Sequence, residues 1–192
     1  MDKIRTFIAV DVSPAVLRRG ADLIERLRTS DAPVKWVDPS KMHLTLKFLG
    51  DVREADLPGV YRGVAQAAAQ GEAFEITLAG AGAFPDLRRP RTVWIGVDRG
   101  ADTLGHLQAA VDKSLKKIGF PKERRRFHPH LTLGRIRQSG IATRRLADQI
   151  RDLEQFDAGT TTISDVVVYA SHLAKTGPTY EVLSRAPLGG GS

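Results

Sequence analysis

The most restrictive feature of this sequence is a tetrapeptide that occurs twice. His43-Leu44-Thr45-Leu46 returns as His130-Leu131-Thr132-Leu133, and the two copies start 87 residues apart. Both have the alternation of a half-buried strand, in which successive side chains point to opposite faces. Each strand therefore buries its leucines and presents an imidazole beside a hydroxyl. If a pseudo-two-fold axis relates the two halves of the chain, the polar faces meet across one central cleft.

Two imidazoles and two hydroxyls that face one point suit the displacement of a phosphodiester. This reaction needs a base at the attacking oxygen, an acid at the leaving oxygen and donors on the non-bridging oxygens. Imidazoles with an ordinary pKa near 6.5 can hold the two unlike protonation states at neutral pH. One histidine beside a threonine is usually incidental, but two identical copies favour a catalytic pair. The candidates are His43 and His130, with Thr45 and Thr132 as phosphate donors.

The remaining pattern predicts an α+β fold, with two similar lobes of antiparallel sheet and outer helices around the cleft. Helices are expected over residues 14–29, 54–70, 101–118 and 141–156, and strands over residues 4–12, 42–49, 74–79, 92–97, 130–135, 163–170 and 180–184. Gly80-Ala81-Gly82 precedes Ala-Phe-Pro rather than a helix, which argues against a dinucleotide-binding fold. We expect one two-lobed domain over residues 1–188 and a flexible tail over residues 189–192.

Composition narrows the chemistry and the partner. The chain has no cysteine, which excludes disulfides, a thiolate nucleophile and zinc sites that contain cysteine. Its net charge of +7 and pI near 10.0 favour an anionic partner such as RNA or a nucleotide. No apolar stretch approaches the roughly 18 residues that a membrane span needs, and the N-terminus does not begin like a signal peptide. We therefore expect a cytoplasmic protein that does not bind membranes.

Several ordered segments resemble the 2H phosphoesterases, and within them the RNA 2′,3′-cyclic phosphodiesterases once described as 2′–5′ RNA ligases. The resemblance covers nearly the whole chain. Its segments are Arg5–Val10 followed by Pro14, Trp36–Gly50 with His-Leu-Thr-Leu-Lys-Phe-Leu-Gly, Phe84-Pro85, Trp94, Phe127–Arg135, Ser171–Leu173, Gly177 and Tyr180.

The resemblance implies how such an enzyme would act. His43 is then the proton donor and His130 the proton acceptor, without a metal or another cofactor. The reaction opens a terminal 2′,3′-cyclic phosphate to a 2′-phosphate while the 3′ oxygen leaves. The substrate is then an RNA end or a small nucleotide cyclic phosphate, and 2′–5′ RNA ligation is a further activity. We also expect the protein to be a monomer.

Four further residues are candidates for contact with the ligand. Arg135 matches an arginine common in the family, yet it lies on the opposite face from His130 and Thr132 unless Gly134 permits a bulge. Lys47 shares the face of His43, although a lysine at a strand end is more often solvated. Phe48 is predicted on the core side, whereas Trp36 precedes the strand in a loop and is a candidate base-stacking residue.

Alternatives to this interpretation exist for both the site and the function. His128, His130 and His43 could form a three-histidine zinc site, but no suitably placed carboxylate accompanies them. The basic runs, which are Lys122 with Arg124–Arg126 and Arg88, Arg89 and Arg91, are expected to guide RNA backbone. The protein could also act on another cyclic or 2′–5′ phosphodiester, or bind RNA without catalysis.

Overall fold

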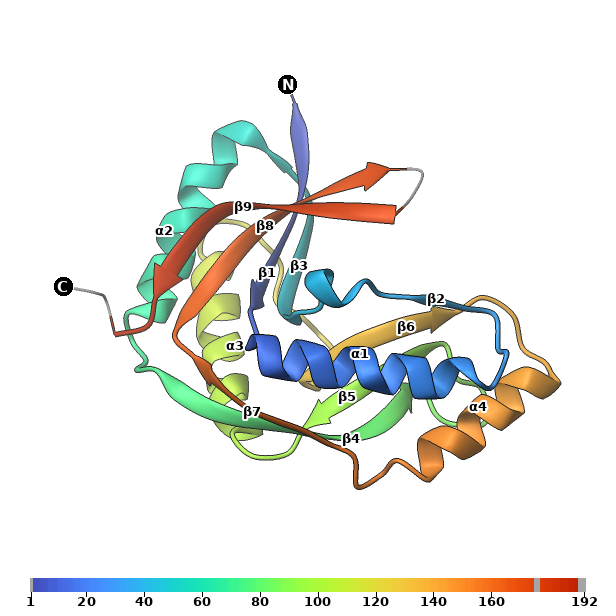
Figure 1. The fold of residues 1–192 in the computed structure, drawn as a ribbon. Helices are drawn as coiled ribbons and strands as arrows, with labels where there is room; N and C mark the ends of the chain where they lie inside the picture. The colour runs from blue at the N-terminus through green and yellow to red at the C-terminus, as the bar shows by residue number, and fades with distance from the viewer. Residues whose placement is uncertain (1, 175–176, 190–192) are drawn as a thin grey trace.

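The computed structural model describes residues 2–174 and 177–189, and Figure 1 shows their arrangement. Within these residues the strands form one antiparallel sheet in the order β7-β4-β5-β6-β3-β1-β8-β9, with β2 paired to β6. The strands are β1 (Lys3–Val10), β2 (Val34–Trp36), β3 (Leu44–Arg53), β4 (Phe74–Phe84), β5 (Thr92–Val97), β6 (His130–Ile136), β7 (Asp157–Ile163), β8 (Asp165–Ala174) and β9 (Gly177–Pro187). The helices are α1 (Pro14–Arg28), α2 (Leu57–Ala68), α3 (Ala101–Lys116) and α4 (Ile141–Arg151), with short 3-10 turns at Pro39–Lys41 and Glu54–Asp56.

The sheet consists of two similar lobes that meet in its middle. We call β3-β1-β8-β9 the β3 lobe and β6-β5-β4-β7 the β6 lobe. Helices α2 and α3 pack against the β3 lobe, while α1 contacts β7 and α4 contacts β4 in the β6 lobe. The order β1-α1-β3-α2 is repeated as β5-α3-β6-α4. The predicted α+β fold with two similar antiparallel lobes is therefore confirmed.

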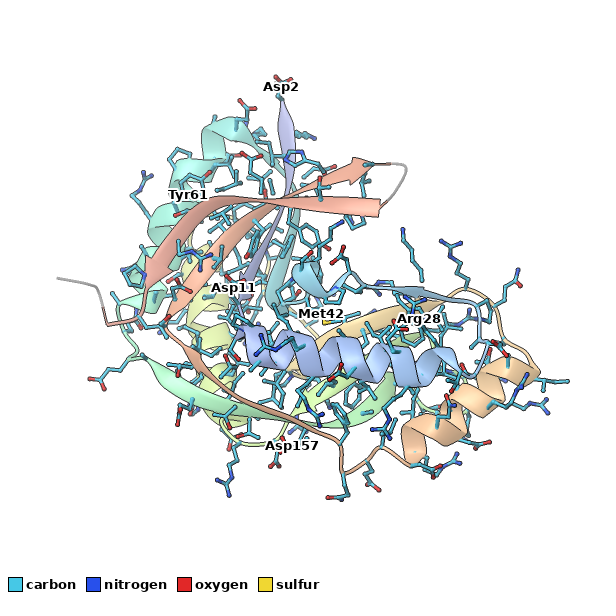
Figure 2. The ribbon with its side chains drawn as sticks, viewed as in Figure 1. Asp2, Asp11, Arg28, Met42, Tyr61 and Asp157 are labelled. Atoms are coloured by element: carbon cyan, nitrogen blue, oxygen red, sulfur yellow. The ribbon has the colours of Figure 1, made fainter. Side chains whose placement is uncertain are left out.

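Helix α1 illustrates how local sequence fixes the position of a helix. The Ser13 side chain accepts a hydrogen bond from the Val16 amide, and Pro14 occupies the first turn, where no amide is needed. The Ser13 amide in turn donates to Thr161 Oγ1 at 2.9 Å, which ties the start of the helix to β7. On the buried side, Gly20 leaves room for Met42, whose sulfur would lie 3.0 Å from an added Cβ (Figure 2). Helix α1 is thereby held against the residue that precedes His43.

The sequence pattern did not predict two of the strands, β2 and β7, and two helices are shorter than expected. Strand β2 has three residues, which is too few for a periodic signal. Strand β7 reads Asp-Ala-Gly-Thr-Thr-Thr-Ile and lies at the sheet edge, where a polar strand can remain solvated. The helix expected over residues 141–156 ends at Arg151, and the one expected over residues 54–70 becomes an α-helix only from Leu57.

A bulge in β3 overturns the expectation for Lys47. On β1, Ala9 pairs with Thr45 and Ile8 pairs with Lys47, so Leu46 is an extra residue without a partner. One extra residue reverses the facing of everything that follows it. Lys47 therefore points into the core, where it pairs with Asp112 of α3 and donates to the Pro121 carbonyl oxygen at 2.7 Å. The prediction that Lys47 shares the face of His43 is wrong.

Two further expectations concern the ends of the chain and the membrane. The single domain over residues 1–188 stays a prediction, and of the tail expected over residues 189–192 only Gly189 lies among the described residues. Its amide donates to the Ala68 carbonyl oxygen at 3.3 Å. None of the helices in the described ranges has the length and apolar character needed to cross a bilayer.

The buried pair generates a stability prediction. The side chains of Lys47 and Asp112 are only 5% and 4% exposed, so Lys47→Met leaves a carboxylate buried without its cation. We expect a loss of about 3–5 kcal/mol in the free energy of unfolding, measured by urea denaturation at neutral pH. The double variant Lys47→Met/Asp112→Leu should regain most of this loss because it buries no charge. Arg151→Met breaks an exposed pair with Asp148 and serves as the control, with little expected effect. Equal effects of Lys47→Met and Arg151→Met would contradict the prediction.

Candidate active site

The two copies of the tetrapeptide lie side by side where the lobes meet. Leu44 of β3 pairs with Leu131 of β6, and both leucines are buried. In an antiparallel pair this register sets His43 opposite Thr132, and Thr45 opposite His130. The four polar side chains are partly exposed on the face opposite to the leucines. The structure therefore brings together His43, His130, Thr45 and Thr132, as the sequence predicts.

Both histidines are oriented by the backbone in the same way. His43 Nδ1 lies 2.9 Å from the Lys41 carbonyl oxygen, and His130 Nδ1 lies 2.7 Å from the His128 carbonyl oxygen. A carbonyl oxygen only accepts hydrogen bonds, so Nδ1 carries a hydrogen in both rings. Nε2 is thus the nitrogen that gains or loses a proton, and each imidazole is held so that this nitrogen can serve as acid or base.

His43 lies among aromatic rings with a carboxylate beyond them. The Phe7 ring stacks on it at 4.8 Å between centroids, the Tyr180 ring meets it edge-on at 5.3 Å, and the Tyr169 ring lies 6.0 Å away. Burial lowers the pKa of His43, while the hydrogen bond to Lys41 and the charge of Asp11 act in the opposite direction. Asp11 accepts a hydrogen bond from the Tyr169 hydroxyl at 2.6 Å. A negative charge therefore favours the protonated form of His43.

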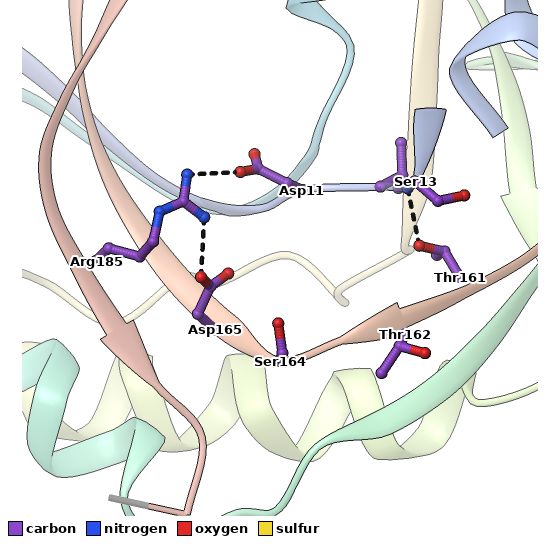
Figure 3. A pocket seen from close by; sticks show the side chains of 8 residues that line it. Asp11, Ser13, Thr161, Thr162, Ser164, Asp165 and Arg185 are labelled. Carbon is purple, nitrogen blue, oxygen red and sulfur yellow. Dashed lines mark hydrogen bonds and ion pairs between the residues drawn. The ribbon is translucent and has the colours of Figure 1, made fainter. Parts of the chain in front are cut away.

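Asp11 is also part of an ion-pair network in a pocket next to the start of α1 (Figure 3). The Arg185 guanidinium bridges Asp11 and Asp165 at 3.0 and 2.9 Å. Because one arginine is shared by two carboxylates, the carboxylates are not fully neutralised. The sequence pattern alone did not indicate this group; the one signal for it is Asp11, the first polar residue after the buried end of β1.

His130 has different neighbours. The Phe84 ring meets it edge-on at 4.8 Å, and the rings of Trp94 and His128 lie 6.5 Å away. Burial lowers the pKa of His130, the hydrogen bond to the His128 carbonyl raises it, and electrostatic repulsion from the His128 ring and Arg135 lowers it further. The electrostatic surroundings of the two histidines thus have opposite signs.

A second bulge decides the position of Arg135. On β5, Trp94 pairs with Thr132 and Val93 pairs with Gly134, so Leu133 is an extra residue. The bulge returns Arg135 to the face of His130, where its guanidinium donates to Thr92 Oγ1 at 3.4 Å. A Cβ on Gly134 would lie 2.6 Å from a methyl carbon of Val34 and 2.7 Å from the Trp36 ring. The space at position 134 therefore suits only glycine. The bulge places Arg135 on the same face as His130, which strand alternation alone did not predict.

The surroundings of the two aromatic candidates, Phe48 and Trp36, differ from the prediction. Phe48 is not on the core side: it follows the bulge in β3, pairs with Phe7 and is 67% exposed. Trp36 lies in β2 rather than in a loop, pairs with Gly134 and has the Arg28 guanidinium 5.9 Å from the centre of its ring. The exposed ring is thus that of Phe48, which is separated from His43 by the ring of Phe7.

The remaining basic and histidine candidates lie in a loop before His130 or on elements outside the histidine pair. Residues 122–126 have no regular structure and follow Pro121, which is held by Lys47. His106 is exposed on α3, and His172 on β8 lies 3.0 Å from Glu181. In the described part of the chain, no three His, Asp or Glu side chains are grouped so that they could share a metal ion.

The chain matches the 2′-5′ RNA ligase superfamily over residues 13–173. It belongs to this superfamily. A protein of Methanothermobacter thermautotrophicus named RNA 2′,3′-cyclic phosphodiesterase is 38% identical over 93% of this chain and 95% of its own length. A protein of Aquifex aeolicus with the same name is 32% identical over 99% of this chain and all of its own length.

Solved structures support the same fold within the superfamily. The protein TT0787 of Thermus thermophilus superposes with a TM-score of 0.82 at 24% identity, covering 97% of this chain and 98% of that chain. LigT of E. coli, solved in complex with 3′-AMP, gives a TM-score of 0.75 at 24% identity, covering 97% of this chain and 99% of that chain. The continuous two-lobed sheet is therefore a fold that this superfamily member shares with both.

Proposed function

We propose that this protein is an RNA 2′,3′-cyclic phosphodiesterase that opens a terminal cyclic phosphate to a 2′-phosphate. One observation carries the proposal: two imidazoles, each with Nδ1 bonded to a backbone carbonyl, lie diagonally across the pair Leu44 and Leu131. Diagonal neighbours on adjacent strands are about 7–8 Å apart, which leaves room for one phosphate between the two Nε2 atoms. The names of the relatives that match over nearly the whole chain support the same activity.

The charges around the two histidines support an assignment of roles. Asp11 favours the charged form of His43, whereas Arg135 and His128 favour the neutral form of His130. His130 Nε2 takes a proton from a water molecule while the oxygen of that water bonds to phosphorus. His43 Nε2 gives its proton to the 3′ oxygen as the bond between phosphorus and that oxygen breaks. Both protons are then exchanged with solvent.

Three further side chains would hold the phosphate during this step. The hydroxyls of Thr45 and Thr132 lie on the same face as the imidazoles and can donate to the non-bridging oxygens. Arg135 can neutralise the charge that develops there. Since donors and proton transfer are supplied by these residues, the proposed mechanism uses neither a metal ion nor another cofactor.

The proposed partner is RNA with a 2′,3′-cyclic phosphate end, or a small nucleotide cyclic phosphate, bound by a monomer. The net charge of +7 and the basic residues Lys122 and Arg124–Arg126 favour association with an RNA backbone. Another 2′–5′ or cyclic phosphodiester as substrate, RNA ligation and simple RNA binding are the competing functions.

A panel of oligoribonucleotides tests the function. The protein should hydrolyse ends with a 2′,3′-cyclic phosphate to the 2′-phosphate and leave 3′-phosphate ends unchanged. Activity should survive exhaustive chelation with EDTA, because no step requires a Lewis acid. Binding to every substrate without turnover would leave only RNA binding, and turnover restricted to 2′–5′ linkages would identify a different phosphodiesterase. Loss of activity with EDTA and recovery with zinc would refute the proton-transfer mechanism.

Two substrates with different leaving groups separate the roles of the histidines. His43→Ala and His130→Ala should each lower kcat on a cyclic phosphate by about a hundredfold or more. On a nitrophenyl phosphodiester, whose leaving group needs little protonation, His43→Ala should recover much of its loss and His130→Ala should not. His106→Ala, at an exposed histidine on α3, is the control. Recovery by His130→Ala instead would reverse the assigned roles.

The pKa shifts predict the pH dependence of kcat/KM. Burial lowers the pKa of both histidines, so the bell-shaped profile of the free enzyme should have its optimum below pH 6.5, the approximate pKa of an unperturbed imidazole. Asp11→Asn keeps an acceptor for Tyr169 but removes the charge that raises the pKa of His43. Its optimum should therefore move to lower pH. Asp165→Asn, which also contacts Arg185, should move it less. An unchanged optimum in Asp11→Asn would show that Asp11 does not act on His43.

A further inference from the structure

The segment over residues 121–126 connects α3 to β6, and all six residues are exposed. In the described residues, no backbone–backbone hydrogen bond involves this segment. It carries four cations, Lys122 and Arg124–Arg126, and one carboxylate, Glu123. Within the same described ranges, none of these cations forms an ion pair. Because neighbouring like charges repel each other, the segment needs contacts from elsewhere to keep one position.

Those contacts come from the buried ion pair of Lys47 and Asp112. Lys47 Nζ donates both to Asp112 Oδ1 and to the Pro121 carbonyl oxygen. The Glu123 amide donates to the same Asp112 Oδ1 at 3.2 Å, and the Arg125 amide donates to Glu123 Oε1 at 3.1 Å. A chain of hydrogen bonds therefore leads from the strand of the first tetrapeptide to the cations that precede the second.

A buried ion pair adds little to stability by itself. Both side chains lose their hydration, and an apolar pair of similar volume often gives an equally stable or more stable protein. An apolar pair, however, offers no partner for a main-chain carbonyl or amide. The hydrogen bonds to Pro121 and Glu123 are thus what this charged pair provides beyond packing.

The other end of the segment is held separately. The Phe127 side chain packs against the hydrophobic core, and the His128 carbonyl oxygen bonds to His130 Nδ1. The orientation of the His130 imidazole therefore does not depend on Lys47 and Asp112. Loss of the ion pair should release residues 121–126 and leave the chemical step intact.

The segment lies close to the candidate active site. Arg126 is four residues before His130, a stretch that extended backbone spans in at most about 14 Å. Nucleotides that precede the cyclic end of an RNA strand can therefore reach these cations. Cations that are already held in place bind phosphates without the loss of freedom that a mobile segment undergoes on binding.

We propose that Lys47 and Asp112 are positioning residues that hold the basic segment on the path of the RNA strand. They thereby favour RNA ends over cyclic mononucleotides as substrates. The inference rests on the proposed function, since it takes the cyclic phosphate to lie between His43 and His130. The substrate class is an RNA strand with several phosphodiesters before its cyclic end, because a mononucleotide has no further phosphates for the segment to bind.

The double variant Lys47→Met/Asp112→Leu tests the proposal, since it removes the hydrogen bonds without burying a charge. For an oligoribonucleotide that ends in a 2′,3′-cyclic phosphate, KM should rise about tenfold while kcat stays unchanged, because fewer cations are held on phosphates. The dependence of kcat/KM on salt concentration should become less steep for the same reason. For adenosine 2′,3′-cyclic phosphate, kcat and KM should both keep their native values. A merely destabilised protein would instead lose activity on both substrates.

Two charge variants complete the experiment. Substitution of Arg124–Arg126 by alanine should reproduce the rise in KM for the oligoribonucleotide, and addition of the double variant to this background should change KM little further, because the two sets act through one contact. The matched control substitutes alanine for three exposed lysines on α3 and directly after it, which are Lys113, Lys116 and Lys117. This control should retain the native KM.

The outcomes separate the inference from the proposed function. A native KM in the double variant would refute the positioning role, and equal losses on both substrates would mean that the ion pair supports the whole fold. A native KM after substitution of Arg124–Arg126 would refute the RNA contact, even if the double variant does not fold. If the native protein hydrolyses neither substrate, the proposed function fails. Trypsin then tests the positioning role: it should cut the double variant within residues 122–126 faster than the native protein, and equal rates would refute it.

Discussion

Leu44 and Leu131 pair across the middle of the sheet, and both are buried beneath the helices. This contact is the one cross-strand pair between β3 and β6 in the described residues, and it joins the two lobes. Since strand side chains alternate, burial of the two leucines forces their polar neighbours to the opposite face. The antiparallel register then fixes which histidine lies opposite which threonine. The geometry of the site is therefore a consequence of where two apolar side chains are buried.

The sequence predicted the parts of the structure that follow a period of two residues. The alternation in the two tetrapeptides placed His43, Thr45, His130 and Thr132 on one face, and the repeat predicted two similar lobes. The pattern could not show that Leu46 and Leu133 are extra residues, because a bulge inserts a residue without changing composition. Phe48 and Lys47 were for this reason assigned to the wrong faces. In β6, Gly134 next to Arg135 indicated that a bulge was possible, whereas β3 has no glycine at the corresponding position.

The bulges also give the inner positions different tasks. Lys47 and Gly134 are equivalent, since each directly follows the extra residue of its strand. Lys47 reaches Asp112 and the Pro121 carbonyl oxygen, so it connects β3 to the segment that leads into the basic residues before His130. Gly134 has no side chain, and the side chains of Val34 and Trp36 on the paired strand β2 occupy the space where its Cβ would lie. In the β3 lobe the residue at this position binds a loop, and in the β6 lobe the lack of a side chain there allows β2 to pair with β6.

The acceptor that orients each imidazole is a backbone carbonyl oxygen. The orientation of the ring therefore does not depend on which side chains neighbour the histidine in sequence. Lys41 and His128 are unlike residues, as are Met42 and Pro129, yet both carbonyl oxygens receive the same hydrogen bond. A carboxylate in that place would have to be preserved together with its histidine, whereas a carbonyl is supplied by any residue. A duplicated segment thus carries its own orienting group, and the two copies can diverge at these positions without losing the tautomer of either ring.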